Sequence, residues 1–215
     1  MTIDNTLLLL GNFFLTLLMV VLVKRRTYRS FPVFFTYQGW SLFSGILCIF
    51  AVSLEPADYM RFYVVNMALD FLLQFAVLAE LGRIVAAHNH NSPPRWALIA
   101  LLLLPTTLVL RSLSSWSVPA GIGELGTHVF KIQQILPVLL LAYLLALVWW
   151  SRLHSSQWPD SALHIATGLG SYFIVCLAVA IIHTHQTMGV QYRWTEEAQS
   201  GSYLGVLSYW LLKLS

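Results

Sequence analysis

The stretch FYVVNMALDFLLQFAVLAELGR, residues 62–83, decides how the rest of the chain is interpreted. It is long and apolar enough to cross a bilayer as a helix, yet it carries Asn66, Asp70 and Gln74 at steps of four residues. Residues four apart lie one above the other on a helix, so these three side chains form one polar stripe. A carboxylate in the apolar part of a membrane helix costs about 2.5–3.5 kcal/mol on insertion scales. We therefore expect the stripe to face other helices or a wet cavity rather than lipid.

The composition of the whole chain indicates a helical membrane protein. Of its 215 residues, 58% are hydrophobic and 10% are charged, whereas soluble domains carry about 25% charged residues. Apolar runs of about 20 residues recur from end to end, and they lack the period-two alternation of a membrane barrel. The net charge of +3 does not indicate a nucleic-acid partner, because the basic residues lie at the ends of the apolar runs. Cys48 and Cys176 lie inside expected spans and are interpreted as small apolar residues.

The apolar runs predict an all-α fold, a seven-transmembrane-helix bundle that forms a single domain over residues 1–215. The expected helices cover residues 5–23, 31–54, 60–86, 96–110, 127–150, 161–183 and 198–214. One side of this arrangement collects most of the basic residues, namely Lys24, Arg25, Arg26, Arg29, Arg83, Arg95, Arg152 and Lys213. The positive-inside rule then places the N-terminus outside and the C-terminus inside. We expect a multipass protein integral to the cytoplasmic (inner) membrane, with the lipid bilayer as its first partner.

Polar residues of four expected segments lie towards the outer side in this arrangement and predict a ligand pocket between helices. The candidates are Asn66, Asp70, Gln74, His128, Lys131, Gln134, His183, His185 and Glu197. Mutual hydrogen bonding that serves only helix packing is the alternative interpretation. His128, His183 and His185 could complete a zinc site with Asp70, but no local ligand spacing enforces it. We assign no catalytic residue, cofactor or metal.

Small and charged residues elsewhere have packing interpretations. Gly168 and Gly170 on the helix over 161–183 allow close helix approach, as do Gly201 and Gly205, which have the G-x-x-x-G spacing. Self-association through the last helix is the functional alternative for that spacing. Glu80 and Arg83, three residues apart, are expected to form an ion pair within their helix.

The segments FPVFFTYQ (31–38), ALDFLLQFAVLAELG (68–82) and ATGLGSYFIVCLAVAIIHTHQ (166–186) resemble small, uncharacterised seven-helix membrane proteins of bacteria. That resemblance implies the architecture and no activity. Asp70 gives a distant likeness to seven-helix zinc-dependent membrane hydrolases, such as the alkaline ceramidases. The paired histidines of those enzymes are absent from the last expected helix here.

The sequence favours a non-enzymatic, sensor-like or partner-binding protein that recognises a small ligand or a partner membrane protein. A small proton-coupled transporter that uses Asp70 is the first alternative, and a zinc-dependent membrane hydrolase is the second.

Overall fold

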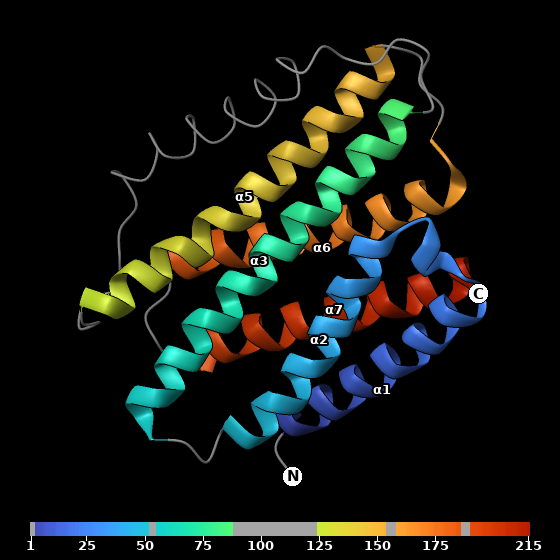
Figure 1. Cartoon of the computed structure of the whole chain (residues 1–215). Helices are drawn as coiled ribbons and strands as arrows, with labels where there is room; N and C mark the ends of the chain where they lie inside the picture. The colour runs from blue at the N-terminus through green and yellow to red at the C-terminus, as the bar shows by residue number, and fades with distance from the viewer. Residues whose placement is uncertain (1–2, 52–54, 88–123, 154–157, 186–189) are drawn as a thin grey trace. The chain divides into compact units, whose positions relative to one another are not determined.

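The computed structural model describes residues 3–51, 55–87, 124–153, 158–185 and 190–215. These residues form six α-helices and a short 3-10 turn, and they contain no strand, so the predicted all-α class is confirmed. The elements are α1 (Ile3–Lys24), η1 (Thr27–Arg29), α2 (Pro32–Ala51), α3 (Pro56–Ala87), α5 (Glu124–Leu153), α6 (Asp160–His185) and α7 (Val190–Leu214) (Figure 1). The predicted helix over 96–110, the fourth in chain order, lies outside the described residues.

Five of the described helices are long and apolar enough to cross a membrane, namely α1, α2, α3, α5 and α6. The last helix is not among the five, so the membrane span expected over 198–214 stays a prediction. Polar residues recur through that helix, with Gln199, Ser202 and Ser208 among them. It also begins at Val190, eight residues before the predicted start at 198. The charged stretch 190–197, expected as a loop, contains neither glycine nor proline and includes good helix formers such as glutamate.

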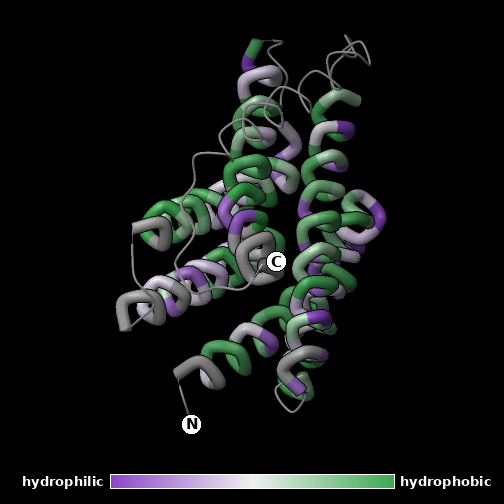
Figure 2. Tube along the Cα trace, turned by 90° about the vertical axis from the view of Figure 1, so that its left-hand side faces the viewer, coloured by the Kyte–Doolittle hydropathy of each residue, from purple (hydrophilic) through white to green (hydrophobic). Residues whose placement is uncertain are grey.

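Large apolar side chains cover much of the outer surface of these helices. Phe13 is 58% exposed, Leu72 is 65% exposed and Phe50 is 68% exposed. Figure 2 shows the hydrophobic colour repeating along most of the helices rather than being confined to one stretch. A water-soluble monomer rarely exposes large contiguous apolar patches, whereas a helix in a bilayer presents such side chains to lipid. The exposure pattern therefore agrees with the five candidate membrane spans.

The described chain divides into two compact units, and each is considered by itself. Unit 1 consists of Met1–Glu80 with Tyr203–Ser215, and unit 2 consists of Leu81–Ser202. The boundaries fall inside α3 and α7, so each of these helices contributes residues to both units. The single domain predicted over residues 1–215 stays a prediction.

In unit 1, α1 and α2 form an antiparallel pair connected through η1 (Figure 1). Leu18 of α1 and Phe34 of α2 are completely buried. The two helices approach so closely at Gly45 that any larger residue there would collide with the side chain of Asn12. The C-terminal half of α7 joins this pair through Trp210, whose ring meets that of Phe34 edge to face at a centroid distance of 5.1 Å. Glycine at position 45 thus leaves space for the side chain of Asn12 between α1 and α2.

In unit 2, α5 and α6 pack against each other as an antiparallel pair. A Cβ atom at Gly170 of α6 would lie 2.9 Å from Cδ2 of Leu144 on α5, so this glycine permits the close approach predicted for it. Gly168 is buried in the same helix. Nε1 of Trp158, just before α6, donates a hydrogen bond of 2.6 Å to Oγ of Ser151 near the end of α5.

Candidate functional site

The polar stripe of α3 lies along α2 within unit 1. The Gln74 side-chain amide donates a hydrogen bond of 2.7 Å to Oδ2 of Asp70 and a longer one, of 3.4 Å, to the hydroxyl of Tyr37 on α2. Gln74 is 4% exposed. The four-residue spacing therefore places Asp70 and Gln74 side by side, as the sequence predicts. The amide nitrogen uses both of its hydrogens, one towards a carboxylate on its own helix and one towards a phenol on the next.

A third helix reaches the same carboxylate. The phenol of Tyr203, on the part of α7 that belongs to unit 1, interacts with the Ser41 side chain of α2 and lies within electrostatic reach of Asp70. We call Asp70, Gln74, Tyr37, Ser41 and Tyr203 the Asp70 cluster. Its members come from α2, α3 and α7, whereas none of the pocket residues predicted from the sequence lies on α2. Gln74 donates to the carboxylate, whereas Tyr37 and Ser41 are linked to it through Gln74 and Tyr203.

On α2, which contributes Tyr37 and Ser41 to this cluster, the side chain of Gln38 is completely buried. Neither its amide nitrogen nor its amide oxygen has a hydrogen-bond partner among the residues that the structure describes. Gln38 follows Tyr37 directly and lies one helical turn from Ser41. Most buried polar side chains in proteins are hydrogen-bonded to protein or to ordered water, so an unpaired amide requires an explanation. A bound molecule that carries both a donor and an acceptor would satisfy it.

Three further polar atoms of unit 1 are buried without a partner in the described part of the chain. They are Nδ2 of Asn12 on α1, Nε1 of Trp40 on α2 and Oδ1 of Asn66 on α3. Asn66 precedes Asp70 by one helical turn and therefore continues the same stripe. The unsatisfied polar groups thus extend along the helices and are not confined to a single position.

The Glu80 side chain accepts hydrogen bonds from the neighbouring helix, which the sequence does not predict. Its Oε1 accepts a hydrogen bond of 2.9 Å from the backbone amide of Val33, and its Oε2 accepts one of 3.0 Å from the amide of Phe34. These amides belong to the first turn of α2, so the carboxylate caps that helix. Arg83, the partner expected from the three-residue spacing, is exposed. Glu80 therefore holds α2 and α3 together instead of serving only its own helix.

The remaining predicted site residues belong to unit 2. Lys131 and Glu197 are half-buried, while Gln134 is 2% exposed, and neither of its amide atoms has a partner within the described ranges. The backbones of His128, His183 and His185 are helical, but their side chains lie outside the description. Because the Asp70 cluster is in unit 1, the predicted convergence of all these groups stays a prediction. Among the described side chains, no group of three or more histidines, cysteines or carboxylates could hold a metal ion.

Sequence reasoning missed Gln38, Ser41, Tyr37 and Tyr203. A signal for three of them was present, because Tyr37, Gln38 and Ser41 are among the polar residues that interrupt the apolar run in residues 31–54. The predicted stripe was confined to one helix, although Tyr37 and Ser41 on α2 are also four residues apart. Tyr203 carries no comparable signal, since tyrosine is common at both apolar and interfacial positions.

No family model, no curated protein and no solved structure matches this chain. The function is therefore argued from the residues of the site alone.

Proposed function

We propose that this chain is a multipass protein of the cytoplasmic membrane that recognises a small polar ligand through the Asp70 cluster and Gln38, without catalysing a reaction. Five apolar helices of spanning length support the membrane assignment. The proposal keeps the seven-span arrangement, with 96–110 and the last helix as the two further spans. It also keeps the N-terminus outside, which the distribution of basic residues favours. In this proposal the bilayer surrounds the protein, and a partner membrane protein is the other class of binding target.

The observation that carries the proposal is the unpaired amide of Gln38. Burying an amide without a hydrogen bond costs about 1–3 kcal/mol on the scale of protein mutations. A leucine at position 38 would fill similar space without that cost, so stability alone does not account for glutamine. A ligand bound there would receive a donor and an acceptor from Gln38. It would also lie near the negative charge that Asp70 carries when ionised, which favours a ligand with hydrogen-bond donors.

Cysteine accessibility tests whether a polar solute reaches this position. The background is the full chain with Cys48→Ala and Cys176→Ser, the serine being chosen because Gln199 donates to the sulfur of Cys176. We expect Gln38→Cys to react with the water-soluble cation methanethiosulfonate-ethylammonium in membranes. The matched control is Leu18→Cys, because Leu18 is equally buried in the apolar core of unit 1. Protection of both positions to the same degree would contradict the proposal.

The charge of the site can be tested with the same reagent. Asp70→Asn is expected to slow the reaction of Gln38→Cys with the cationic reagent. It should leave the reaction with neutral methyl methanethiosulfonate nearly unchanged. The physical reason is that a carboxylate raises the local concentration of cations. Equal effects on both reagents would instead indicate that the substitution only alters packing.

A proton-coupled carrier is the second candidate, and the run of polar residues along α3 favours it. Asn66, Asp70, Gln74 and Glu80 follow one another along a single apolar helix, and ionisable residues inside such helices commonly mark proton or substrate paths. Proton entry into liposomes that contain the protein, driven by a potassium-valinomycin potential, measures this activity. Proton flux that Asp70→Asn abolishes would favour the carrier, while flux that is absent or insensitive to the change would exclude it.

A further inference from the structure

The connection between α1 and α2 is basic and tightly folded. Lys24, Arg25, Arg26 and Arg29 are all exposed in a stretch of six residues. The backbone there is fixed by hydrogen bonds between near neighbours. The amide of Arg26 donates to the carbonyl of Val23 at 3.0 Å, and the amide of Arg29 donates to the carbonyl of Arg26 at 3.0 Å. The cations are therefore mounted on a defined turn.

Arg26 has a backbone conformation that arginine rarely adopts. Its φ angle is 55°, and it is the one residue other than glycine with positive φ among those the structure describes. Glycine or asparagine usually occupies this left-handed conformation, because a Cβ atom is crowded there. An arginine in that place keeps a guanidinium at the expense of backbone strain. Residues held in such conformations are concentrated at binding and functional sites.

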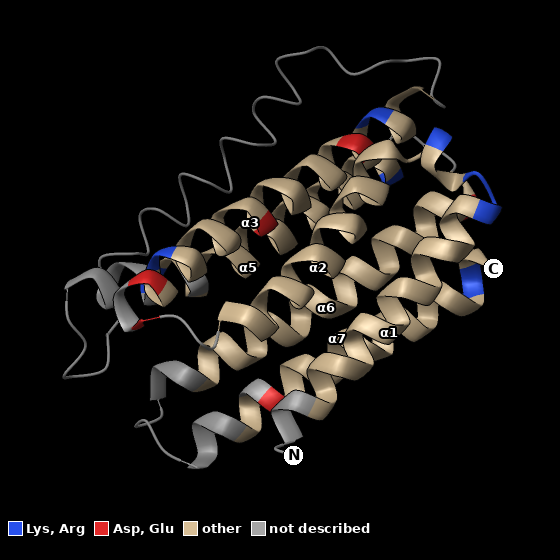
Figure 3. Ribbon diagram, turned by 60° about the horizontal axis from the view of Figure 1, so that its bottom comes forward, with Lys and Arg blue, Asp and Glu red and all other residues tan. Residues whose placement is uncertain are grey.

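The same end of unit 1 gathers more positive charge. Lys213 of α7 is exposed, and the C-terminus lies beside the end of α1 in both Figure 1 and Figure 3. We call Lys24, Arg25, Arg26, Arg29 and Lys213 the basic turn. Within the described ranges none of these five cations forms an ion pair. The carboxylate of Glu80 is buried and bound to backbone amides of α2, so it is not available to neutralise the exposed cations.

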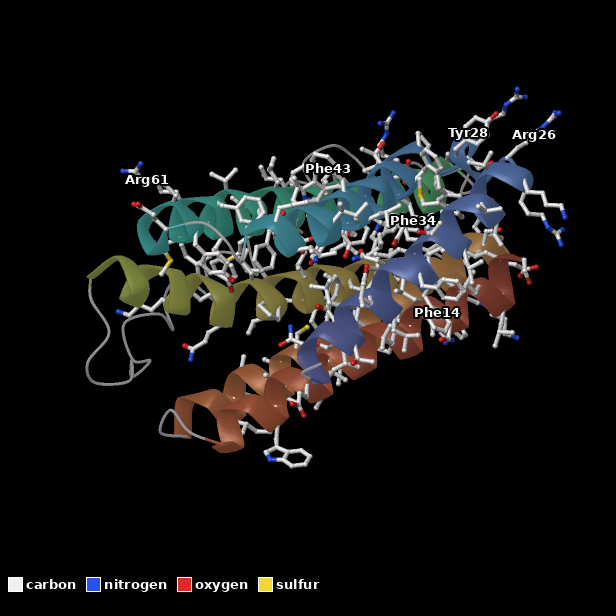
Figure 4. The ribbon with its side chains drawn as sticks, turned by 90° about the horizontal axis from the view of Figure 1, so that it is seen from below. Phe14, Arg26, Tyr28, Phe34, Phe43 and Arg61 are labelled. Carbon is white, nitrogen blue, oxygen red and sulfur yellow. The ribbon has the colours of Figure 1, made fainter. Side chains whose placement is uncertain are left out.

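Aromatic and apolar side chains adjoin the basic turn. The guanidinium of Arg29 lies 6.0 Å from the centroid of the Tyr28 ring, which in turn lies 5.9 Å from the ring of Phe35. Figure 4 shows the side chains of Arg26 and Tyr28 projecting from this end, with Arg61 at the other end of unit 1. On the last turns of α1, Val20 is 60% exposed and Val23 is 52% exposed. Apolar surface thus continues directly from the cations onto the side of an expected membrane span.

We infer that the basic turn binds the phosphate of an anionic phospholipid. Arginine binds phosphate with two parallel hydrogen bonds, and clustered cations at the end of a membrane helix attract anionic lipids. A free phosphate ion would find only exposed cations in water, where such interactions are weak. A lipid would add contacts between its acyl chain and the exposed valines of α1. The combination of cations and apolar surface therefore favours a lipid headgroup over a free anion.

Native mass spectrometry of the purified full chain tests this inference with two lipids that have the same acyl chains. We expect the wild-type chain to retain phosphatidylglycerol in preference to phosphatidylcholine. Arg26→Gly is the decisive variant, because glycine adopts positive φ readily and the turn should keep its shape. The affinity for phosphatidylglycerol should fall about fivefold, which corresponds to about 1 kcal/mol for each basic residue near an anionic surface. Arg61→Gln removes an equally exposed cation from the other end of unit 1 and should leave the preference unchanged.

Several other results would contradict lipid binding by the basic turn. Equal retention of the two lipids by the wild-type chain would overturn it. Inorganic phosphate that displaces phosphatidylglycerol would identify a free-anion site instead of a lipid site. If Arg26→Gly fails to fold, Arg29→Gln removes a cation from a residue with ordinary φ and takes its place. Phosphatidylglycerol binding unchanged in the folded variant, or weakened as much by Arg61→Gln, would also count against the basic turn.

Discussion

The Glu80 carboxylate of α3 lies at the N-terminus of α2, where its Oε2 accepts a hydrogen bond of 3.0 Å from the backbone amide of Phe34. The amides in the first turn of a helix have no partner within that helix, and a nearby side chain usually supplies one. Here the acceptor comes from 46 residues further along the chain. The negative carboxylate also interacts favourably with the positive end of the α2 dipole. The relationship therefore joins two helices with one side chain.

Loss of this cap should destabilise the protein. Glu80→Ala removes both acceptors and is expected to lower the free energy of unfolding by about 2–3 kcal/mol, the upper range for hydrogen bonds to charged groups. Glu80→Gln keeps one acceptor oxygen and should cost less. Thermal unfolding of the full chain in a single detergent measures both effects. Asp58→Asn is the control, since it removes an exposed ion pair with Arg61 that should contribute little. A loss from Glu80→Ala no larger than that from Asp58→Asn would show that the cap does not matter.

Two buried glutamines should respond in opposite ways to replacement by leucine. Gln74→Leu removes the donor that Asp70 uses, and leaving a buried polar group unsatisfied costs about 1–3 kcal/mol. Gln134→Leu, in contrast, replaces an amide that has no partner in the described part of the chain, so it should be neutral or stabilising. Both variants carry the same chemical change in an apolar helix. Comparing their unfolding temperatures therefore separates the hydrogen bond from the effect of removing an amide.

Gln38→Leu should stabilise the fold and abolish ligand binding. Because the amide of Gln38 is buried without a partner among the described residues, leucine is expected to raise the free energy of unfolding by about 1–2 kcal/mol. If Gln38 binds a polar ligand, the same change should abolish that binding. The unfolding temperature reports the first effect. The second effect is measured at Ser41→Cys, one turn away. If Gln38→Leu abolishes the reaction of this cysteine with the methanethiosulfonate reagent, the polar solute no longer enters. A destabilised Gln38→Leu variant would mean that the amide already has a partner, and the ligand argument would fail.

The sequence predicts the helices of this fold well, because long apolar runs in a chain with few charges leave little choice. It errs at α7, where charged residues resemble a loop although they are good helix formers. In the candidate site, the four-residue rule correctly pairs Asp70 with Gln74, since both lie on one helix. Contacts between different helices cannot be predicted from such spacing. The bond between Glu80 and Phe34 depends on how α2 and α3 are arranged, which no local spacing encodes.

The G-x-x-x-G face of α7 gives the last prediction, which concerns self-association. A Cβ atom at Gly201 or Gly205 would meet nothing within 4 Å in the described chain, so these glycines pack against no described neighbour. Gly205→Ala should leave the fold intact and stabilise the helix by up to about 1 kcal/mol. If two copies of the chain meet at this face, Gly205→Leu should prevent their close approach and convert a cross-linkable dimer into monomers.

Gly170→Ala provides the contrast for that experiment, because its Cβ would lie 2.9 Å from Leu144 within the same chain. Because Cδ2 is the end of a flexible side chain that can shift, this variant should change the unfolding temperature little and leave cross-linking between copies unchanged. Cross-linking in membranes, followed by separation of monomer from dimer, gives the readout for both variants. A Gly205→Leu variant that cross-links as efficiently as the wild-type chain would rule out α7 as the contact between copies. The open glycines would then reflect only the packing of this helix against lipid.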